Sequence, residues 1–366
     1  MGYQPQFTIT PLLLGRVEQI AALRERIQSA TVDVAWIPAL QKDSRARNAH
    51  SSTAIEGNPL TLEQVRAVEE GREVPAIADR ARREVLNYFA GLRYIEKHAR
   101  KKVIGHEDVL ELHRVVAAKV MDQGDAGRYR TIGVRVGSYV PPPPREVSVL
   151  MLELLEWSNG DSAALSPVLS SAILHHRFEA IHPFADGNGR TGRALALWEL
   201  YRRGFDMHHI FSVDEFYWED RPRYYAALQE VRRQGDDLTT WLEYTAEGLL
   251  ITLQRVWTRL QSFSAQSAGK KLMLRPRQEQ LLQLLRDRSS LTPREIWAGL
   301  GVSKQGAMDL LRPLMEAGLI VREGTRKSGR YRLKPRATEA ARPRASARPR
   351  GSRIPSPRSR GRGTIP

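Results

Sequence analysis

Apolar residues recur at intervals of three and four along most of the first 265 residues, the spacing that places them on one face of an α-helix. Polar residues fill the positions between them, so each such segment predicts an amphipathic helix. Examples of the predicted helices are Leu12–Ile27, Leu62–Glu70, Ala76–His98, His106–Met121, Val147–Trp157, Leu169–Ala180 and Leu238–Phe263. The pattern therefore predicts a mainly α-helical protein, and it contains no internal repeat.

One segment, between Arg128 and Pro144, departs from the helical pattern. Its β-branched residues alternate with others, a glycine lies in the middle and a run of prolines follows. Such alternation, ended by prolines, is typical of a short pair of strands rather than of a helix. We expect a β-hairpin flap on an otherwise helical body.

A second unit begins near Arg275. Three short helices and a hairpin are predicted at Gln278–Arg286, Thr292–Leu300, Ser303–Ala317 and Leu319–Lys334. This order is that of a winged helix-turn-helix, whose third helix reads DNA. The cationic and polar side chains that would face nucleic acid are Lys304, Gln305, Arg326, Lys327 and Arg330. A surface for contacts with another protein is the alternative.

Composition limits the chemistry. The 366 residues can form two or three domains, and 41% hydrophobic and 27% charged residues are ordinary for a soluble globular protein. Cysteine is absent, which excludes disulfides, a thiolate zinc site and a cysteine nucleophile. The apolar run Pro11–Leu14 is too short for a signal sequence or a membrane span. We expect a cytoplasmic protein with no membrane contact.

The net charge of +16 is unevenly distributed. Residues 335–366 contain nine arginines and one glutamate, and 9 − 1 = +8, so half of the excess lies in this segment. Because the segment has few large apolar side chains, it cannot bury enough surface to fold, and we expect a disordered tail. It is either a solubilising tail or a weak, salt-sensitive contact with nucleic acid.

Candidate chemistry is concentrated in residues 182–193, HPFADGNGRTGR. The glycines directly precede a helical pattern, so backbone N–H groups at the start of that helix can bind an anion. Arg190 and Arg193 are three residues apart on one face of the helix, and guanidinium groups suit phosphate oxygens. Asp186 offers a hard oxygen ligand for Mg²⁺, and His182 has the near-neutral pKa that a general base needs. The segment predicts a magnesium–nucleotide phosphate site with a base at its rim.

Residues 182–193 match every specified position of H-P-F-x-[DE]-G-N-G-R-x-x-R, the signature of the Fic family, which this sequence resembles. The resemblance extends over roughly residues 50–250. It includes Phe178–Ile181, the VGSYVPPPP end of the flap, Arg223-Tyr224-Tyr225 with Leu228, and Trp241.

The resemblance implies transfer of AMP from ATP to a Tyr, Thr or Ser hydroxyl of a target protein and of the enzyme itself. In this assignment His182 deprotonates the hydroxyl, Asp186 holds Mg²⁺, and Arg190 and Arg193 bind the outer phosphates. Gly187, Asn188 and Gly189 form the anion cradle with Asn188 toward the α-phosphate, and Thr191 and Gly192 complete the nucleotide site.

The flap residues Val136, Gly137, Ser138 and Tyr139 are implied to align the target chain and flank the nucleotide. Tyr224 and Tyr225 are implied to wall the adenine, although an aromatic pair on a helix is otherwise a core feature. Arg232 stands at a spacing where related sequences can carry an amide. We interpret His175 and His176 as packing residues rather than zinc ligands, because no further ligand lies at a suitable helical spacing.

Upstream, Ser52 and Glu56 are four residues apart and Gly57 follows as a natural helix end. The segment resembles the inhibitory motif of the Fic family, [ST]-x-x-x-E-[GN], which implies a contact between Glu56 and Arg193. A carboxylate on that arginine would compete with the γ-phosphate. In some relatives the same glutamate supports removal of AMP.

These expectations combine into one organisation: a helical region at 1–110 carrying the inhibitory helix, a Fic core at 111–265, a winged helix-turn-helix at 272–334 and the tail at 335–366. The expected function is an adenylyltransferase autoinhibited by Glu56, with ATP as co-substrate and Mg²⁺ as cofactor, and with DNA as a further partner of residues 272–366.

The alternatives are AMP removal or another nucleotidyl or phosphate-group transfer at the same site. From a different class comes a DNA-binding regulator whose Fic-like core senses nucleotide. The sequence leaves open whether the chain forms a homo-oligomer.

Overall fold

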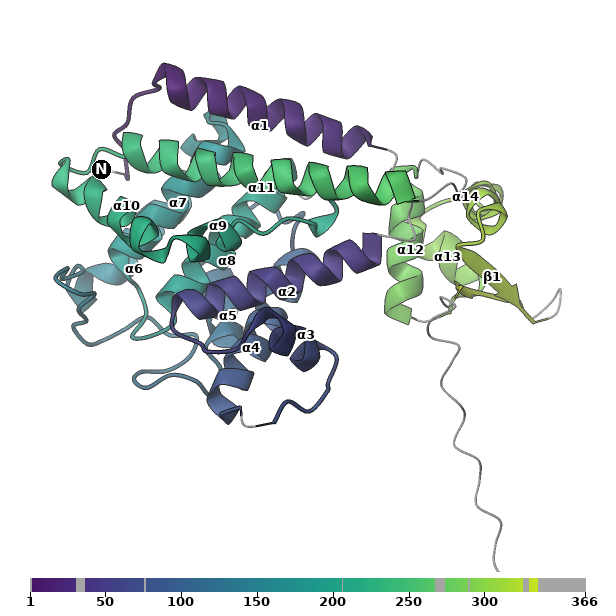
Figure 1. Cartoon of the computed structure of the whole chain (residues 1–366), viewed down its shortest axis with the longest axis horizontal. Coiled ribbons are helices and arrows are strands. Elements are labelled where there is room, and N and C mark those ends of the chain that lie inside the picture. The colour runs from purple at the N-terminus through teal and green to yellow at the C-terminus, as the bar shows by residue number, and fades with distance from the viewer. Residues whose placement is uncertain are drawn as a thin grey trace, which may run out of the picture. The chain divides into compact units, whose positions relative to one another are not determined.

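The computed structural model describes residues 2–30, 37–75, 77–205, 207–266, 274–288, 290–324 and 329–334. The chain divides into two compact units, Met1–Met273 and Leu274–Pro366. Both are built mainly from helices, which confirms the predicted fold class (Figure 1).

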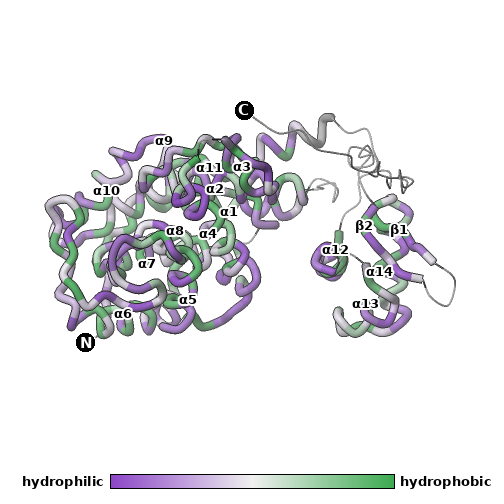
Figure 2. The backbone as a smooth tube through the Cα atoms, turned by 90° about the horizontal axis from the view of Figure 1, so that it is seen from below, coloured by the Kyte–Doolittle hydropathy of each residue, from purple (hydrophilic) through white to green (hydrophobic). Residues whose placement is uncertain are grey.

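The first unit contains eleven α-helices among its described residues. They are α1 (Pro11–Ser29), α2 (Ile37–Ile55), α3 (Leu62–Glu69), α4 (Asp79–Lys97), α5 (His106–Val116), α6 (Pro144–Asn159), α7 (Pro167–Ile181), α8 (Asn188–Leu200), α9 (Asp214–Glu219), α10 (Arg221–Arg233) and α11 (Thr239–Gln266). Apolar and polar residues alternate along these helices in Figure 2, as expected for amphipathic helices around one core.

Local sequence fixes several helix starts. Thr10 accepts a hydrogen bond from the Leu13 backbone at the start of α1, and Ser166 caps α7 in the same way. In both helices proline occupies the first position, where its missing N–H has no cost. These caps explain why the predicted and observed starts differ by only one or two residues.

Helices α7 and α8 pack against each other within the core of this unit, which includes the buried side chains of Phe178, Trp198 and Trp241. Gly192 permits the close approach of the two helices, because a Cβ atom there would collide with Glu179 and Phe178. The first and last helices of the unit, α1 and α11, lie side by side (Figure 1).

The flap is less regular than the predicted hairpin. Its only strand-like pairing is one antiparallel bridge, in which the backbones of Val136 and Tyr139 exchange hydrogen bonds of 2.9 and 3.0 Å across Gly137 and Ser138. Gly137 has φ of 60°, the left-handed region that glycine favours. The run Pro141–Pro144 has no N–H to donate, so the pairing stops at a single tight turn.

In the second unit α12 (Pro276–Arg288), α13 (Pro293–Leu300) and α14 (Lys304–Glu316) precede β1 (Ile320–Glu323) and β2 (Arg330–Leu333). The strands are antiparallel, with Ile320 opposite Leu333, and Leu291 adds a bridge to Tyr331. The buried residues of this unit include Leu281, Leu285, Ile296, Leu311 and Tyr331. The predicted contacts from Arg326 and Lys327, and the tail at 335–366, lie outside the described residues.

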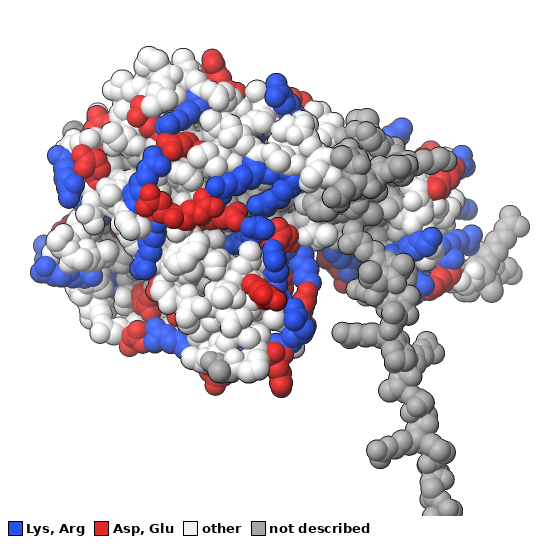
Figure 3. All heavy atoms as spheres, viewed as in Figure 1, with Lys and Arg blue, Asp and Glu red and all other residues white. Residues whose placement is uncertain are grey.

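Basic and acidic side chains are interspersed on the face seen in Figure 3. In the first unit one ion-pair network joins Arg47 of α2 to Asp43, and Arg47 to Glu215 of α9, at 2.8 and 2.6 Å. Arg66 of α3 and Arg259 of α11 also reach Asp43. In the part of the chain that is described, no helix combines the length and apolar character that a membrane crossing needs.

Candidate active site

Residues 182–193 form the six-residue loop that follows α7 and the first turns of α8. His182 ends α7 with φ of 50° and donates its backbone N–H to Phe178 O at 2.8 Å. Gly187, with φ of 77°, immediately precedes α8. Two left-handed residues thus reverse the chain, and the loop ends at a helix N-terminus whose first N–H groups have no partners within the helix.

The Asn188 side chain braces this loop. Its Oδ1 accepts a hydrogen bond from Phe184 N, and its Nδ2 donates to Phe184 O, both at 2.8 Å. Thr191 Oγ1 donates to Gly187 O at 2.8 Å, and both side chains are buried. Phe184 uses both ends of the Asn188 side-chain amide, so the placement of Asn188 toward the α-phosphate stays a prediction that falls on its backbone.

His113 of α5 and Arg130 support the same loop, and neither was singled out in the sequence. The ring of His113 stacks on Phe184 at 3.6 Å between centroids, and its Nδ1 accepts the N–H of Gly127. Its Nε2 must then carry the proton that it donates to Asp186 O at 2.9 Å. Burial lowers the pKa of His113 to about 4, consistent with this neutral form.

The buried Arg130 guanidinium ties the base of the flap to the end of α7. Its Nε donates to His182 O at 2.8 Å, and its other nitrogens donate to the carbonyls of Ile132, Pro142 and Ile181. The Arg130 backbone N–H also donates to Pro183 O at 2.9 Å. Arg130 therefore fixes the backbone that presents His182. This contact could not be predicted from sequence spacing, because Arg130 and His182 are 52 positions apart.

His182 is held neutral by its surroundings. Burial lowers the pKa of His182 to about 4, against smaller opposing effects of the Glu179 backbone carbonyl and the Glu56 carboxylate. Within the described residues its Nδ1 makes no hydrogen bond of ordinary geometry. A neutral imidazole is the form that can accept a proton.

The predicted contact between Glu56 and Arg193 is present. Arg193 Nη2 donates to Glu56 Oε1 and to Ser52 O, and its Nε donates to Ser52 Oγ, all at 2.8 Å. Burial opposes the charge of Arg193, but Glu56 and other groups, Asp214 among them, raise the pKa of Arg193 well above its ordinary value. The Arg193 side chain is 1% exposed, whereas that of Glu56 is 35% exposed. The Arg193 guanidinium is thus buried in the protein, whereas the Glu56 carboxylate lies at the surface.

The Glu56 carboxylate lies directly over the first turn of α8. A Cβ atom on Gly189 would collide with Glu56 Oε1, so only glycine leaves room for the carboxylate at this position. Glu56 itself lies just past the end of α2, and Gly57 turns the chain with φ of 96°. An anionic group of this chain therefore occupies the place where an anion would meet the free N–H groups of α8.

Arg190 and Asp186 lie close to each other within the same segment. Arg190 is buried, with its Nη1 3.8 Å from Glu84 Oε1 and its Nη2 3.6 Å from Asp186 Oδ1. In the described part of the chain, Arg190 Nε and Nη1 have no hydrogen-bond partner. The Asp186 carboxylate is partly exposed and accepts the N–H of Gly187.

No group of three or more potential metal-ligating His, Asp or Glu residues occurs among the described residues. Asp186 still offers a hard oxygen donor. Mg²⁺ commonly takes one or two carboxylates together with phosphate oxygens and water, and that donor set fits this loop when a nucleotide is bound.

The flap is fastened to α7 and α10. Tyr139 donates its hydroxyl to Ala180 O at 2.8 Å, and the Arg232 guanidinium lies 3.4 Å from the centre of the Tyr139 ring. Gly137 and Ser138 at the tip are exposed. Arg232, the departure noted in the sequence, therefore stacks under the flap in this protein.

The two tyrosines of α10 differ in their surroundings. Tyr224 is 1% exposed, and its hydroxyl lies 3.1 Å from His175 Nε2. Its ring belongs to the core, and the assignment of Tyr224 to the adenine site stays a prediction. Tyr225 is partly exposed and donates to Ile55 O at 3.3 Å, next to Glu56.

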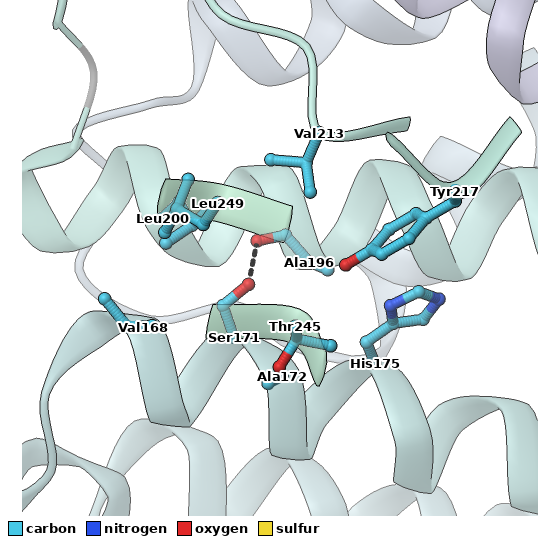
Figure 4. Close-up of a pocket in the computed structure, with 10 residues that line it drawn as sticks. All are labelled: Val168, Ser171, Ala172, His175, Ala196, Leu200, Val213, Tyr217, Thr245 and Leu249. Carbon is cyan, nitrogen blue, oxygen red and sulfur yellow. Dashed lines mark hydrogen bonds between the residues drawn. The ribbon is translucent and has the colours of Figure 1, made fainter. Parts of the chain in front are cut away.

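His175 and His176 are buried, and burial lowers the pKa of His175 to about 3 and that of His176 to about 4. Beside His175 lies a cavity of about 30 Å³, lined also by Ser171, Tyr217 and Thr245 (Figure 4). Its volume suits a single water molecule. None of residues 182–193 lines this cavity, so it is separate from the candidate site.

Comparisons with known proteins find a matching family model, related sequences and similar solved structures. Residues 103–200 match the sequence model of the Fic/DOC family. The chain is 36% identical over 211 residues to protein adenylyltransferase fic-1 of Caenorhabditis elegans, covering 56% of this chain and 40% of that protein. It is 33% identical over 225 residues to protein adenylyltransferase Fic of Aedes aegypti, covering 60% and 44%. The chain thus spans less than half the length of these relatives.

Among solved structures, a Fic family protein from Desulfovibrio desulfuricans G20 superimposes with a TM-score of 0.62 and 28% identity, over 92% of this chain and 99% of that one. Residues 134–508 of C. elegans Fic-1 superimpose with a TM-score of 0.59 and 28% identity, over 68% of this chain and 73% of that one.

Proposed function

We propose that this chain, whose residues 103–200 form a Fic/DOC family domain, is a protein adenylyltransferase that transfers AMP from ATP to a Tyr, Thr or Ser hydroxyl. The observation that carries the proposal is the turn between α7 and α8. It holds a neutral histidine, a glycine-rich helix N-terminus and a buried arginine within twelve residues. The similarity to proteins named adenylyltransferases supports the same reaction.

In the proposed reaction the free N–H groups at the start of α8 and the Arg193 guanidinium bind the phosphates of ATP. Arg190 stabilises the loop that carries Asp186. When bound, Mg²⁺ on Asp186 would neutralise phosphate charge. His182 takes the proton of the target hydroxyl, whose oxygen then attacks the α-phosphorus while diphosphate leaves. Val136–Tyr139 of the flap, which Tyr139 ties to Ala180 of α7, would position the target chain.

We propose further that Glu56 restrains this reaction. Its carboxylate forms a charge-assisted hydrogen bond with Arg193 and covers Gly189, so the phosphates of ATP must displace it to reach both. Ser52, in the last turn of α2, accepts two further hydrogen bonds from Arg193. The resting enzyme is therefore expected to be slow.

Removal of AMP from a modified target is a second candidate activity of the site. The partly exposed Glu56 carboxylate beside Arg193 favours it, because a carboxylate there can orient a water molecule. The second unit supports a separate binding role. Its three helices and hairpin are compatible with a winged helix-turn-helix, and Lys304 and Gln305 are exposed at the start of α14, which would contact DNA.

The test uses the purified chain with Glu56→Gly and ATP labelled on either the α- or the γ-phosphate. Label is expected to enter protein from α-labelled ATP alone, and mass spectrometry should find AMP adducts on hydroxyl side chains. Incorporation from γ-labelled ATP would instead show phosphoryl transfer. Absence of both labels at saturating MgATP, with and without candidate target proteins, would contradict the proposed function.

A further inference from the structure

Glu179 is a buried carboxylic acid with no assigned task. It lies on α7 one helical turn before His182, and its side chain is only 10% exposed. Its Oε2 is 3.8 Å from His182 Nδ1, and its Oε1 has no hydrogen-bond partner in the described part of the chain. Buried polar groups without partners are uncommon in folded proteins, so the unpaired Glu179 Oε1 and the unpaired His182 Nδ1 on two neighbouring side chains call for a reason.

Several elements supply charge around the pair. Glu179 faces Arg193 of α8, Glu56 after α2 and Arg232 of α10. His182 faces Glu56, Arg232 and also Arg130 at the base of the flap. Burial dominates both groups: it raises the pKa of Glu179 to about 7 and lowers the pKa of His182 to about 4.

Space for the Glu179 side chain is provided by the neighbouring helix. A Cβ atom on Gly192 would collide with Glu179 Oε1, so glycine at this position of α8 leaves room for the carboxyl group. The acid is therefore enclosed between α7 and α8, next to the one ring nitrogen of His182 that faces the protein interior. The other nitrogen, Nε2, is left for a substrate.

A base whose conjugate acid has a pKa near 4 accepts a hydroxyl proton poorly at neutral pH, since efficient general bases have pKa values near the working pH. An ionised carboxylate close to the ring stabilises the imidazolium and raises its pKa. Glu179 lies in place to do this through Nδ1, 3.8 Å from its Oε2, which leaves Nε2 to accept the proton.

We propose that Glu179 is a positioning residue whose carboxylate stabilises the protonated form of His182 while His182 Nε2 holds the proton of the target hydroxyl. This inference rests on the proposed function. In the step, the hydroxyl O–H bond breaks and its proton moves to Nε2. The oxygen–α-phosphorus bond forms as the bond to diphosphate breaks, and the Nδ1–H then points to Glu179. Nothing is oxidised or reduced.

Because the two groups interact, their titration belongs to the pair. Above pH 7 Glu179 is ionised and His182 neutral, and Glu179 takes up a proton as the pH falls through about 7. Below that pH the carboxylate no longer has a free negative charge to offer. The proposal therefore predicts that the activity rises with pH through about 7.

The direct test observes His182 without any reaction. The ¹³Cε1 resonances of ¹³C-labelled histidine are followed from pH 4 to 9 in the full chain, and His182→Asn identifies the signal of His182. In the unmodified chain this signal should move through a step near pH 7, and in Glu179→Gln that step should be lost. Glu230→Gln, a carboxylate on the surface of α10, is the matched control and should keep it. Identical His182 titrations in the chain and in Glu179→Gln would overturn the proposal.

The kinetic test uses the Glu56→Gly background. Adding Glu179→Gln should lower kcat at pH 8 by about tenfold or more, the equivalent of one pKa unit, and remove the rise near pH 7. The KM for ATP should stay within about twofold of the parent value. A general disturbance of the site would change the KM as well as kcat. Glu179→Asp keeps a carboxylate and should restore part of the rate.

If Glu179→Gln does not fold, Glu179→Asp carries both measurements, and a His182 step near pH 7 that keeps its size and position would overturn the proposal. If no variant transfers AMP, the proposed function fails, while the histidine titration still decides the role of Glu179.

Discussion

The two sides of the candidate site are held in different ways. On the motif side, Asn188, Thr191 and Arg193 are buried, and their side chains bond to the backbone or to buried neighbours. On the other side, Glu56 and the flap tip are exposed, and Glu56 meets Arg193 through one hydrogen bond. The groups that would carry the chemistry are thus fixed by the fold.

The largest effect should come from the motif side. His182→Ala removes the proposed base and should reduce AMP transfer in the Glu56→Gly background by roughly 10²–10⁴-fold. ATP binding, measured by calorimetry, should persist, because the phosphates contact α8 and Arg193 instead. Transfer near the rate of the parent protein would rule out His182 as the base.

On the covering side, Glu56→Gly should raise self-modification by about 10²–10³-fold, which corresponds to roughly 3–4 kcal/mol. Mg²⁺ should still be required. The matched control is Glu70→Gly, which also places glycine next to a helix end but lies on the surface after α3. Its rate should equal that of the unmodified chain. Equal acceleration by Glu70→Gly would show that local loosening, not release of Arg193, is responsible.

The pH dependence of the free energy of unfolding should reveal that Glu179 is buried. The pKa of Glu179 rises from 4.5 to about 7 in the folded chain. Between these values the folded state keeps a proton that the unfolded state releases, so the contribution of Glu179 to the free energy of unfolding falls as the pH rises. In the unmodified chain His182, whose folded pKa is lowered, contributes in the opposite direction between about pH 4 and 6.5.

The difference in free energy of unfolding between Glu179→Gln and the unmodified chain should therefore shift by about 2–3 kcal/mol in favour of Glu179→Gln as the pH rises from 4.5 to 8. Urea unfolding at the two pH values measures this change. The surface variant Glu230→Gln should show no such gain. Parallel stabilities of Glu179→Gln and the unmodified chain at both pH values would contradict the burial of this acid.

The smallest effect is expected at the flap. Arg232→Ala removes the cation stacked on Tyr139, an interaction worth about 0.5–2 kcal/mol, so the KM for a target protein should rise by up to about 30-fold. The KM of Arg232→Lys should lie between those of the parent protein and Arg232→Ala, because an ammonium lacks the flat face of a guanidinium. The neighbouring Arg233→Ala, on the exposed side of α10, should change nothing. An unchanged KM in Arg232→Ala would show that the stack does not hold the flap.

The sequence predicted the helices well, because periodicity and caps such as Thr10-Pro11 and Ser166-Pro167 are local signals. The Glu56–Arg193 contact followed from the resemblance of two motifs that lie far apart in the chain. The direction of the Asn188 amide could not be predicted, since an amide can serve a ligand or a loop and spacing does not distinguish them.

Arg130 and Glu179 were missed for a related reason. Arg130 bonds to carbonyls about 50 positions away, and the acid of Glu179 matters only because Gly192 of another helix makes room for it. In the flap, alternation favoured two strands, but the prolines that follow cannot donate the hydrogen bonds a longer pair needs. Tertiary packing, rather than local pattern, decides each of these features.

The central claim is that Glu56 acts through Arg193, and a double-mutant cycle tests it most directly. Initial rates of labelled AMP incorporation are measured at one ATP concentration for the unmodified chain, Glu56→Gly, Arg193→Ala and the double variant. Arg193→Ala removes both the partner of Glu56 and a phosphate contact, so the double variant should be no faster than Arg193→Ala alone. If Glu56→Gly accelerates transfer equally with and without Arg193, the restraint does not act through that contact.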